Sequence, residues 1–154
     1  MLKRTPCVGA CSTTYGDLVC RGCKRFSHEI VGWNGFDGEQ RRMVWERLLS
    51  LRSGATAAVV EVVDEARVRS SSAALGVADA AQFDCLNLLY EALQRLQWRE
   101  RGVTLAELGV RLLAANQDPA AGDAEPGELL ARIDQEFYRR SLAQYERNFR
   151  ISPL

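Results

Sequence analysis

Four of the chain's five cysteines lie within its first 23 residues, in two closely spaced pairs. Three residues separate Cys7 from Cys11, two separate Cys20 from Cys23, and eight residues join the pairs. Each pair can form a turn that directs two sulfurs at one ion, and the joining loop brings the turns together. A glycine inside each pair allows the backbone to turn tightly behind the sulfurs. The spacing therefore predicts a metal site with these four residues, the N-terminal cysteines, as its ligands.

The ligand set suits more than one metal centre. A short four-cysteine loop with a two-residue knuckle is typical of structural zinc, whereas iron–sulfur clusters use the same ligands at looser spacings. The three-residue gap between Cys7 and Cys11 is slightly wide for a zinc knuckle and does not decide between them. A redox dithiol at Cys20 and Cys23 is a third interpretation, but the sequence lacks the strand-then-helix setting of a thioredoxin-like motif.

Charge is distributed unevenly along the chain, although the total is zero. Residues 1–53 hold nine Lys/Arg against five Asp/Glu, net +4, and residues 54–154 hold eleven against fifteen, net −4. Four thiolates around a divalent ion leave an excess of two negative charges, so the basic segment partly balances the site.

Two basic pairs near the cysteines, Lys24-Arg25 and Arg41-Arg42, allow a nucleic-acid-binding face as an alternative. We favour a solvated surface that balances the thiolate charge.

The sequence also allows a prediction of the cellular compartment. No stretch approaches the roughly 18–20 apolar residues of a membrane-spanning helix. Lys3 and Arg4 are not followed by an apolar run, so we expect neither a signal peptide nor membrane association. We predict a cytoplasmic protein, in which reduced thiols serve as metal ligands rather than as disulfides.

The segment that carries the cysteines is expected to be a loop followed by helices. Residues 5–26 are rich in Pro, Gly, Ser and Thr, which disfavour regular structure. Farther along, Asp37 and Gln40 form a capping box that opens a helix. Helices are expected over 27–31 and about 38–52, the second ended by Ser53-Gly54. Trp33 is expected to cover the metal loop and seal it against the second helix, giving the thiolates a drier surrounding.

Helical signals dominate the rest of the chain. Apolar residues recur at helical spacing, and a second capping box pairs Thr104 with Glu107. The run from Val59 to Val63 has strand-like β-branching, but the surrounding alanines favour helix. Helices are expected over about 56–63, 64–75, 80–99, 104–115 and 126–149, with an exposed loop over 116–127.

The predicted fold class is therefore mainly α. A small N-terminal four-cysteine metal loop, packed on a helix, is followed by a helical C-terminal body. The predicted domains are a cysteine-rich metal-binding module over residues 1–53 and a helical extension of unknown role over residues 55–154.

For Cys85 and His28, which could also take part in chemistry, we expect structural or surface roles. Cys85 lies on the apolar stripe of its predicted helix, where a free cysteine behaves as a small hydrophobe. His28 is the only histidine, and a surface role is favoured over metal ligation because four cysteines are available. No partner for a nucleophilic centre on His28 can be placed, and no phosphate loop or dinucleotide fingerprint is present. An enzyme is the least supported class.

Several motifs in the first third of the chain fall in one family pattern. They are the run from Pro6 to Phe26 with Gly22 between two cysteines, then Trp33, then the Arg41-Arg42 pair. They resemble the YdhL-like family of bacterial proteins, the domain of unknown function 1289, over about residues 5–52. Residues 55–154 loosely resemble the helical extension of longer members. That family is described as predicted iron–sulfur proteins without an established activity. The resemblance therefore implies an iron–sulfur cluster on the N-terminal cysteines, slightly ahead of zinc.

The predicted function is metal binding by the N-terminal cysteines, as an iron–sulfur cluster or a structural zinc site. The alternative is a zinc-stabilised interaction module that binds a protein or nucleic-acid partner.

Overall fold

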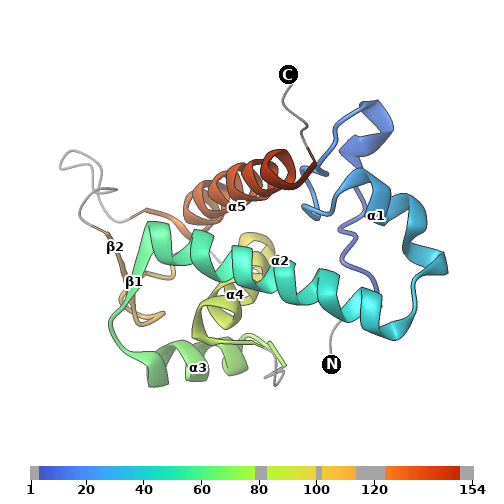
Figure 1. The fold of residues 1–154 in the computed structure, drawn as a ribbon. Helices are drawn as coiled ribbons and strands as arrows, with labels where there is room; N and C mark the ends of the chain where they lie inside the picture. Colours follow the sequence, from blue (N-terminus) through green and yellow to red (C-terminus); the bar gives the residue numbers. More distant parts are fainter. Residues whose placement is uncertain (1–3, 79–82, 100–101, 114–123, 150–154) are drawn as a thin grey trace. The chain divides into compact units, whose positions relative to one another are not determined.

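The computed structural model describes residues 4–78, 83–99, 102–113 and 124–149, which form a mainly helical fold, as predicted (Figure 1). The helices are α1 (Ser27–Gly32), α2 (Gly38–Val59), α3 (Glu65–Ala74), α4 (Cys85–Arg99) and α5 (Pro126–Phe149). Two short strands, β1 (Val60–Val62) and β2 (Val110–Leu112), and two 3-10 turns, η1 (Ser12–Tyr15) and η2 (Trp33–Gly35), complete the elements of this part of the chain.

The chain divides into two compact units. The α3–α4 unit contains residues 52–136. The cysteine unit joins the described residues up to Leu51 with those from Phe137 onward. Helices α2 and α5 are each divided between the two units, α2 after Leu51 and α5 after Glu136. The predicted division into domains over residues 1–53 and 55–154 concerns independent folding and stays a prediction.

Helix α2 begins as predicted but does not end as predicted. Asp37 Oδ1 accepts from the Gln40 amide (2.8 Å) and Gln40 Oε1 accepts from the Asp37 amide (2.9 Å), which completes the capping box. The expected stop at Ser53-Gly54 is wrong, because the helix continues to Val59. Glycine inside a helix costs only about 1 kcal/mol. The residues that follow, Ala55 and Thr56, are fully buried, and that packing outweighs the cost.

A two-stranded sheet replaces parts of two predicted helices. Strand β1 pairs with β2 in antiparallel register, with Val60 opposite Leu112 and Val62 opposite Val110. The helix predicted over 56–63 is therefore wrong from Val60 onward. The helix predicted over 104–115 is wrong throughout its described part, 104–113, which contains turns and β2. Valine suits a strand only where a partner strand is present, and here the partner lies about fifty residues away in sequence.

The second capping box forms, but the described residues from there to β2 form no helix. Thr104 and Glu107 exchange the expected hydrogen bonds at 2.7 and 3.2 Å, but only turns follow before β2. Gly109 ends these turns at φ +81°, and its carbonyl accepts from the amides of Val63 and Asp64. A side chain at Gly109 would lie 2.6 Å from the Asp64 carbonyl oxygen. The chain must therefore leave helical geometry here to meet the start of α3.

Helices α3 and α4 pack on one another in the α3–α4 unit. Asp64 caps α3 by accepting from the Arg67 amide (3.1 Å), and Gly76, at φ +80°, lies just beyond the end of α3. Asp84 caps α4 by accepting from the Asn87 amide (2.7 Å), so α4 begins at Cys85. The predicted start at residue 80 lies outside the described residues. An apolar cluster lies around these helices: Val77, Leu88 and Ala92, with Leu75 and Phe83 against them.

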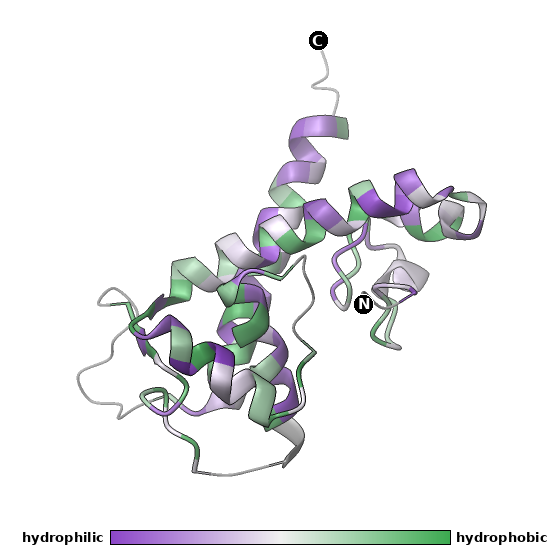
Figure 2. Cartoon of the chain, turned by 90° about the horizontal axis from the view of Figure 1, so that it is seen from below, coloured by the Kyte–Doolittle hydropathy of each residue, from purple (hydrophilic) through white to green (hydrophobic). Residues whose placement is uncertain are grey.

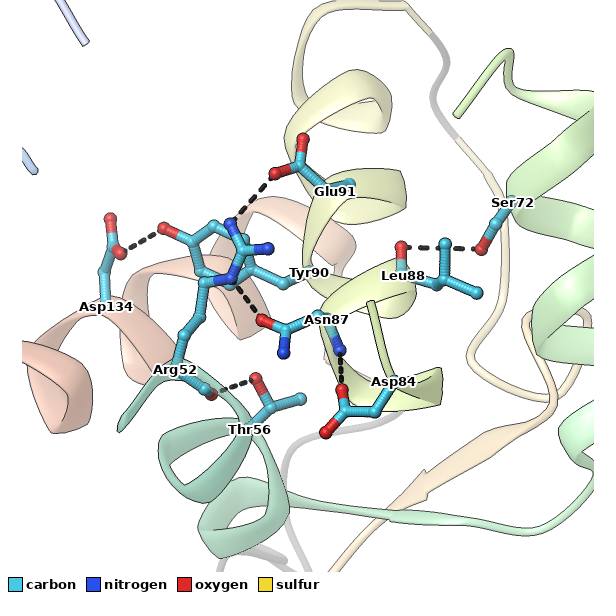
Figure 3. Close-up of polar contacts among 9 residues, drawn as sticks. All are labelled: Arg52, Thr56, Ser72, Asp84, Asn87, Leu88, Tyr90, Glu91 and Asp134. Carbon is cyan, nitrogen blue, oxygen red and sulfur yellow. Dashed lines mark hydrogen bonds and ion pairs between the residues drawn. The ribbon is translucent and has the colours of Figure 1, made fainter. Parts of the chain in front are cut away.

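A buried arginine joins α2 to α4 in the same unit (Figure 3). The Arg52 guanidinium donates to Asn87 Oδ1 (2.6 Å) and Glu91 Oε1 (2.9 Å), and it lies 4.5 Å from the Tyr90 ring centre. The Tyr90 hydroxyl donates to Asp134 of α5 at 2.5 Å. Burial, followed by the charge of Asp134, raises the pKa of Tyr90 far above its usual value, so the phenol stays protonated as the donor.

No helix in the described ranges is both long and apolar enough to cross a membrane. Hydrophilic and hydrophobic residues alternate along the helices in Figure 2.

Replacing Arg52 by Met should lower the free energy of unfolding by about 3 kcal/mol, because Glu91 and Asn87 would lose a buried partner. Arg111→Met is the matched control. Its ion pair with Glu61 has side chains that are 63% and 47% exposed, so the expected loss is below about 1 kcal/mol. Urea unfolding followed by circular dichroism measures both. Equal losses in the two variants would contradict a special role for Arg52.

Candidate metal centre

Cys20 and Cys23 lie at the tip of a small hairpin formed by residues 18–27, the cysteine hairpin. Val19 and Phe26 form an antiparallel bridge between its arms. Three further backbone hydrogen bonds close it: Ser27 N to Leu18 O (2.8 Å), Cys20 N to Arg25 O (2.9 Å) and Lys24 N to Cys20 O (2.8 Å). Lys24 adopts a left-handed conformation with φ 63°, which costs a non-glycine residue about 1–2 kcal/mol. The backbone is thus bent sharply just behind the second cysteine.

The turn that carries Cys7 and Cys11 packs directly on this hairpin. A side chain at Gly22 would lie 2.6 Å from the Ala10 carbonyl oxygen and 2.8 Å from Val8 Cγ2. The Cys20 thiol also faces Ala10, with its Sγ 3.7 Å from the carbonyl oxygen. The joining loop adds a hydrogen bond from the Arg21 amide to Ser12 Oγ (2.8 Å). The structure therefore brings the two cysteine turns into contact.

The two glycines that lie inside the cysteine pairs, Gly9 and Gly22, are required for different reasons. Gly9 has φ +93° with open space around it, so it supplies the conformational freedom that we predicted. Gly22 does not have a positive φ. The expectation that it eases a tight turn is wrong, and it is needed instead because the other cysteine turn approaches so closely.

Cys20 and Cys23 are both buried, and their thiols interact. Burial raises the pKa of Cys20, but hydrogen bonds from the amides of Cys23, Ser12 and Gly22 and from the Cys23 thiol bring it down to about 7. Burial also raises the pKa of Cys23, and the Arg25 guanidinium opposes that rise by donating from Nε to Sγ at 3.3 Å. Several hydrogen-bond donors that stabilise thiolate sulfur therefore surround this pair.

Cys7 and Cys11 make local contacts instead. Cys7 is exposed and its Sγ accepts from the Gly9 amide (3.4 Å), while the half-buried Cys11 thiol lies 2.8 Å from the Thr13 hydroxyl. Among the residues that the structure describes, no group of three or more His, Cys, Asp or Glu side chains is arranged to hold a metal ion. The four-ligand site stays a prediction, in which Cys20 and Cys23 already lie together.

The basic residues of the hairpin, Lys24 and Arg25, do not form the solvated surface that we expected. Lys24 is 2% exposed and Arg25 is 4% exposed. Lys24 Nζ donates to the Gly22 carbonyl (3.0 Å) and lies 5.1 Å from the Phe137 ring centre. The nucleic-acid face loses two of its four members by this burial. Of the other pair, Arg42 is exposed and forms ion pairs with Glu39 and Glu46 of its own helix.

Trp33 is buried and contacts Arg25, which in turn contacts Cys23. The Arg25 guanidinium lies 4.8 Å from the centre of the Trp33 ring, and that of Arg41 lies 5.6 Å from it. Arg41, on α2, also donates two hydrogen bonds to the Trp33 carbonyl (3.0 and 3.3 Å). The contacts form a chain from α2 through Arg41, Trp33 and Arg25 to Cys23.

Sequence patterns missed the pair formed by Glu29 and Arg47. Arg47 of α2 donates to both carboxylate oxygens of Glu29 (2.5 and 2.6 Å), and its guanidinium lies 3.9 Å from the Phe26 ring centre. Glu29 also accepts from the Phe26 amide (2.8 Å), as the third residue of a helix does in a capping box. The three-residue spacing from Phe26 to Glu29 could have indicated this helix start. It was missed because Phe26 lacks the polar side chain that completes a capping box.

The second half of α5 contributes aromatic side chains to the cysteine unit. The Arg21 guanidinium lies 4.7 Å from the Tyr138 ring centre, and the Phe26 ring packs edge-on against Tyr145 (5.2 Å) and Phe149 (5.7 Å). His28 is exposed, as predicted, and packs against Phe149 (5.0 Å).

Cys85 belongs to the α3–α4 unit and is the first residue of α4. It is half-buried rather than in the core, so the expected core position is only partly right. Burial raises its pKa, with a smaller contribution from Glu65.

Replacing Gly22 by Ala should separate the two cysteine turns, because the new methyl group meets a backbone oxygen that cannot move aside cheaply. We expect a loss of about 1–3 kcal/mol in the free energy of unfolding and faster labelling of Cys20 by a thiol reagent. Gly35→Ala is the matched control, since nothing lies within 4 Å of a side chain there. Parent-like labelling of Cys20 in Gly22→Ala would refute the contact.

No curated protein and no solved structure matches the chain at a significant level. One family model does match, and it covers the span that the sequence motifs indicated. Residues 5–52, which contain the N-terminal cysteines, match the family described as "Protein of unknown function (DUF1289)".

Proposed function

We propose that the chain binds one metal centre, an iron–sulfur cluster or a zinc ion, through Cys7, Cys11, Cys20 and Cys23. The contact between the two cysteine turns at Gly22 is the observation that carries this proposal. It supports the proposal because the two turns that carry the four cysteines adjoin one another, and a four-thiolate site needs two such turns.

The donor set fits such a centre. Cys20 and Cys23 are buried side by side, with backbone amides and a guanidinium around them that favour thiolate sulfur. Binding requires the Cys7 and Cys11 side chains to exchange their local contacts with Gly9 and Thr13 for the metal. Sites of this kind are rarely complete without their metal, because binding and folding are coupled.

A bound zinc ion would supply a cross-link between the turns, and a bound iron–sulfur cluster would supply one-electron transfer. In either case buried residues of this chain would surround Cys20 and Cys23 and orient their sulfurs. Trp33 is buried against Arg25, and Phe26 is buried in the same hairpin.

A zinc-stabilised interaction module is the second candidate, and one observation favours it. Three apolar residues on or beside the cysteine turns are largely exposed: Val8, Tyr15 and Leu18. Exposed apolar residues beside a structural metal suit a protein partner. Nucleic acid is less favoured, because Lys24 and Arg25 are buried.

The metal is identified by purifying the full chain anaerobically and measuring iron, acid-labile sulfide and zinc with a visible spectrum. We expect one centre per chain. Iron with sulfide and visible absorbance supports the cluster, whereas stoichiometric zinc without absorbance supports the interaction module.

Replacing Cys20 and Cys23 together by Ser should abolish metal retention, because the two buried ligands are lost. Cys85→Ser is the matched control and should retain metal as the parent does, since Cys85 belongs to the other unit. If the double variant retains the parent's metal content, the ligand assignment is wrong.

A further inference from the structure

We propose that Arg25 is the positioning residue of this metal centre: it orients the Cys23 sulfur and supplies a buried positive charge beside it. The inference rests on the proposed function and names a residue that metal-ligand spacing does not reveal.

Arg25 is tied to both buried cysteines. Its side-chain Nε donates to Cys23 Sγ at 3.3 Å, and its backbone carbonyl accepts from the Cys20 amide at 2.9 Å. A rotation of the Arg25 backbone would therefore disturb one cysteine, and a movement of its side chain would disturb the other. One residue thus couples the two ligands of the knuckle.

The guanidinium is also fixed from its other side. It lies 4.8 Å from the Trp33 ring centre, and Arg41 holds the Trp33 carbonyl through two hydrogen bonds. A side chain fixed in this way loses little further freedom when it donates to sulfur. Arg25 is therefore pre-oriented by contacts that do not involve the metal.

The positive charge of Arg25 would stabilise the thiolates of the proposed centre. Arg25 is only 4% exposed, and burying a guanidinium is costly unless negative charge lies beside it. Four thiolates around a divalent ion, or around an iron–sulfur cluster, leave an excess of negative charge on the sulfurs. A cation that donates to one of those sulfurs offsets part of this excess, so metal binding and burial of Arg25 favour one another.

The test separates charge from packing by comparing Arg25→Lys, which keeps the charge, with Arg25→Met, which keeps the apolar stem. Each full-length variant, purified with its own metal, is challenged with a chelator, and metal loss is followed over time. Zinc affinity is then measured by competition with a chromophoric chelator. We expect Arg25→Met to bind zinc about 10–100-fold more weakly than the parent, and Arg25→Lys to recover most of the loss.

Arg42→Met is the matched control, because Arg42 is an exposed arginine of α2 that forms ion pairs with Glu39 and Glu46 of its own helix. It should stay close to the parent. Cobalt substitution adds a spectroscopic readout: the thiolate-to-cobalt absorption should shift in Arg25→Met and not in Arg42→Met. If Arg25→Met loses its helical circular dichroism, Arg25→Gln takes its place.

The outcomes are distinct. A parent chain that holds neither iron nor zinc defeats the proposed function. A parent that holds metal while Arg25→Met binds zinc equally well defeats only the role of Arg25. Equal weakening in Arg25→Met, Arg25→Lys and Arg42→Met would show a general loss of stability and no particular role of Arg25, which also overturns the inference.

Discussion

Arginine side chains stacked on aromatic rings, each hydrogen-bonded to an acceptor, are the interaction on which both units depend. Arg25 stacks on Trp33 and donates to Cys23, Arg47 stacks on Phe26 and pairs with Glu29, and Arg52 stacks on Tyr90 and pairs with Glu91. The planar guanidinium can satisfy a ring face and an acceptor at once, which an ammonium does less well. Cations thereby become part of the interior.

This interaction matters most in the cysteine unit, where the hairpin supplies few apolar side chains. Val19 and Phe26 are buried, but the other buried residues of the hairpin are the cysteines, Lys24 and Arg25. An interior of that composition is stable only if its charges are compensated. The proposed thiolate centre on the two cysteine turns would offset the charge of Arg25, and metal binding would then be coupled to the folding of this unit.

Local chemistry made parts of the fold predictable. Both capping boxes form with the predicted partners, and the cysteine turns lie together as their spacing indicates. Where a long-range contact competes with a local preference, the local preference loses. Gly54 does not end α2 because the next turn is buried, and Val60 leaves the helix because Leu112 is available as a strand partner. No pattern within either segment contains that information.

The sequence by itself predicted the ligand set of the candidate site, and it determined the helical class and the start of α2, because these follow from residue type and short spacing. Only the tertiary structure decided that Gly22 is required by the approach of Ala10, and that Lys24 and Arg25 are buried instead of solvated. It also showed that Arg25 joins Trp33 to Cys23. The physical reason is that close approach and burial depend on which distant segments meet, and this exceeds the range of local propensity.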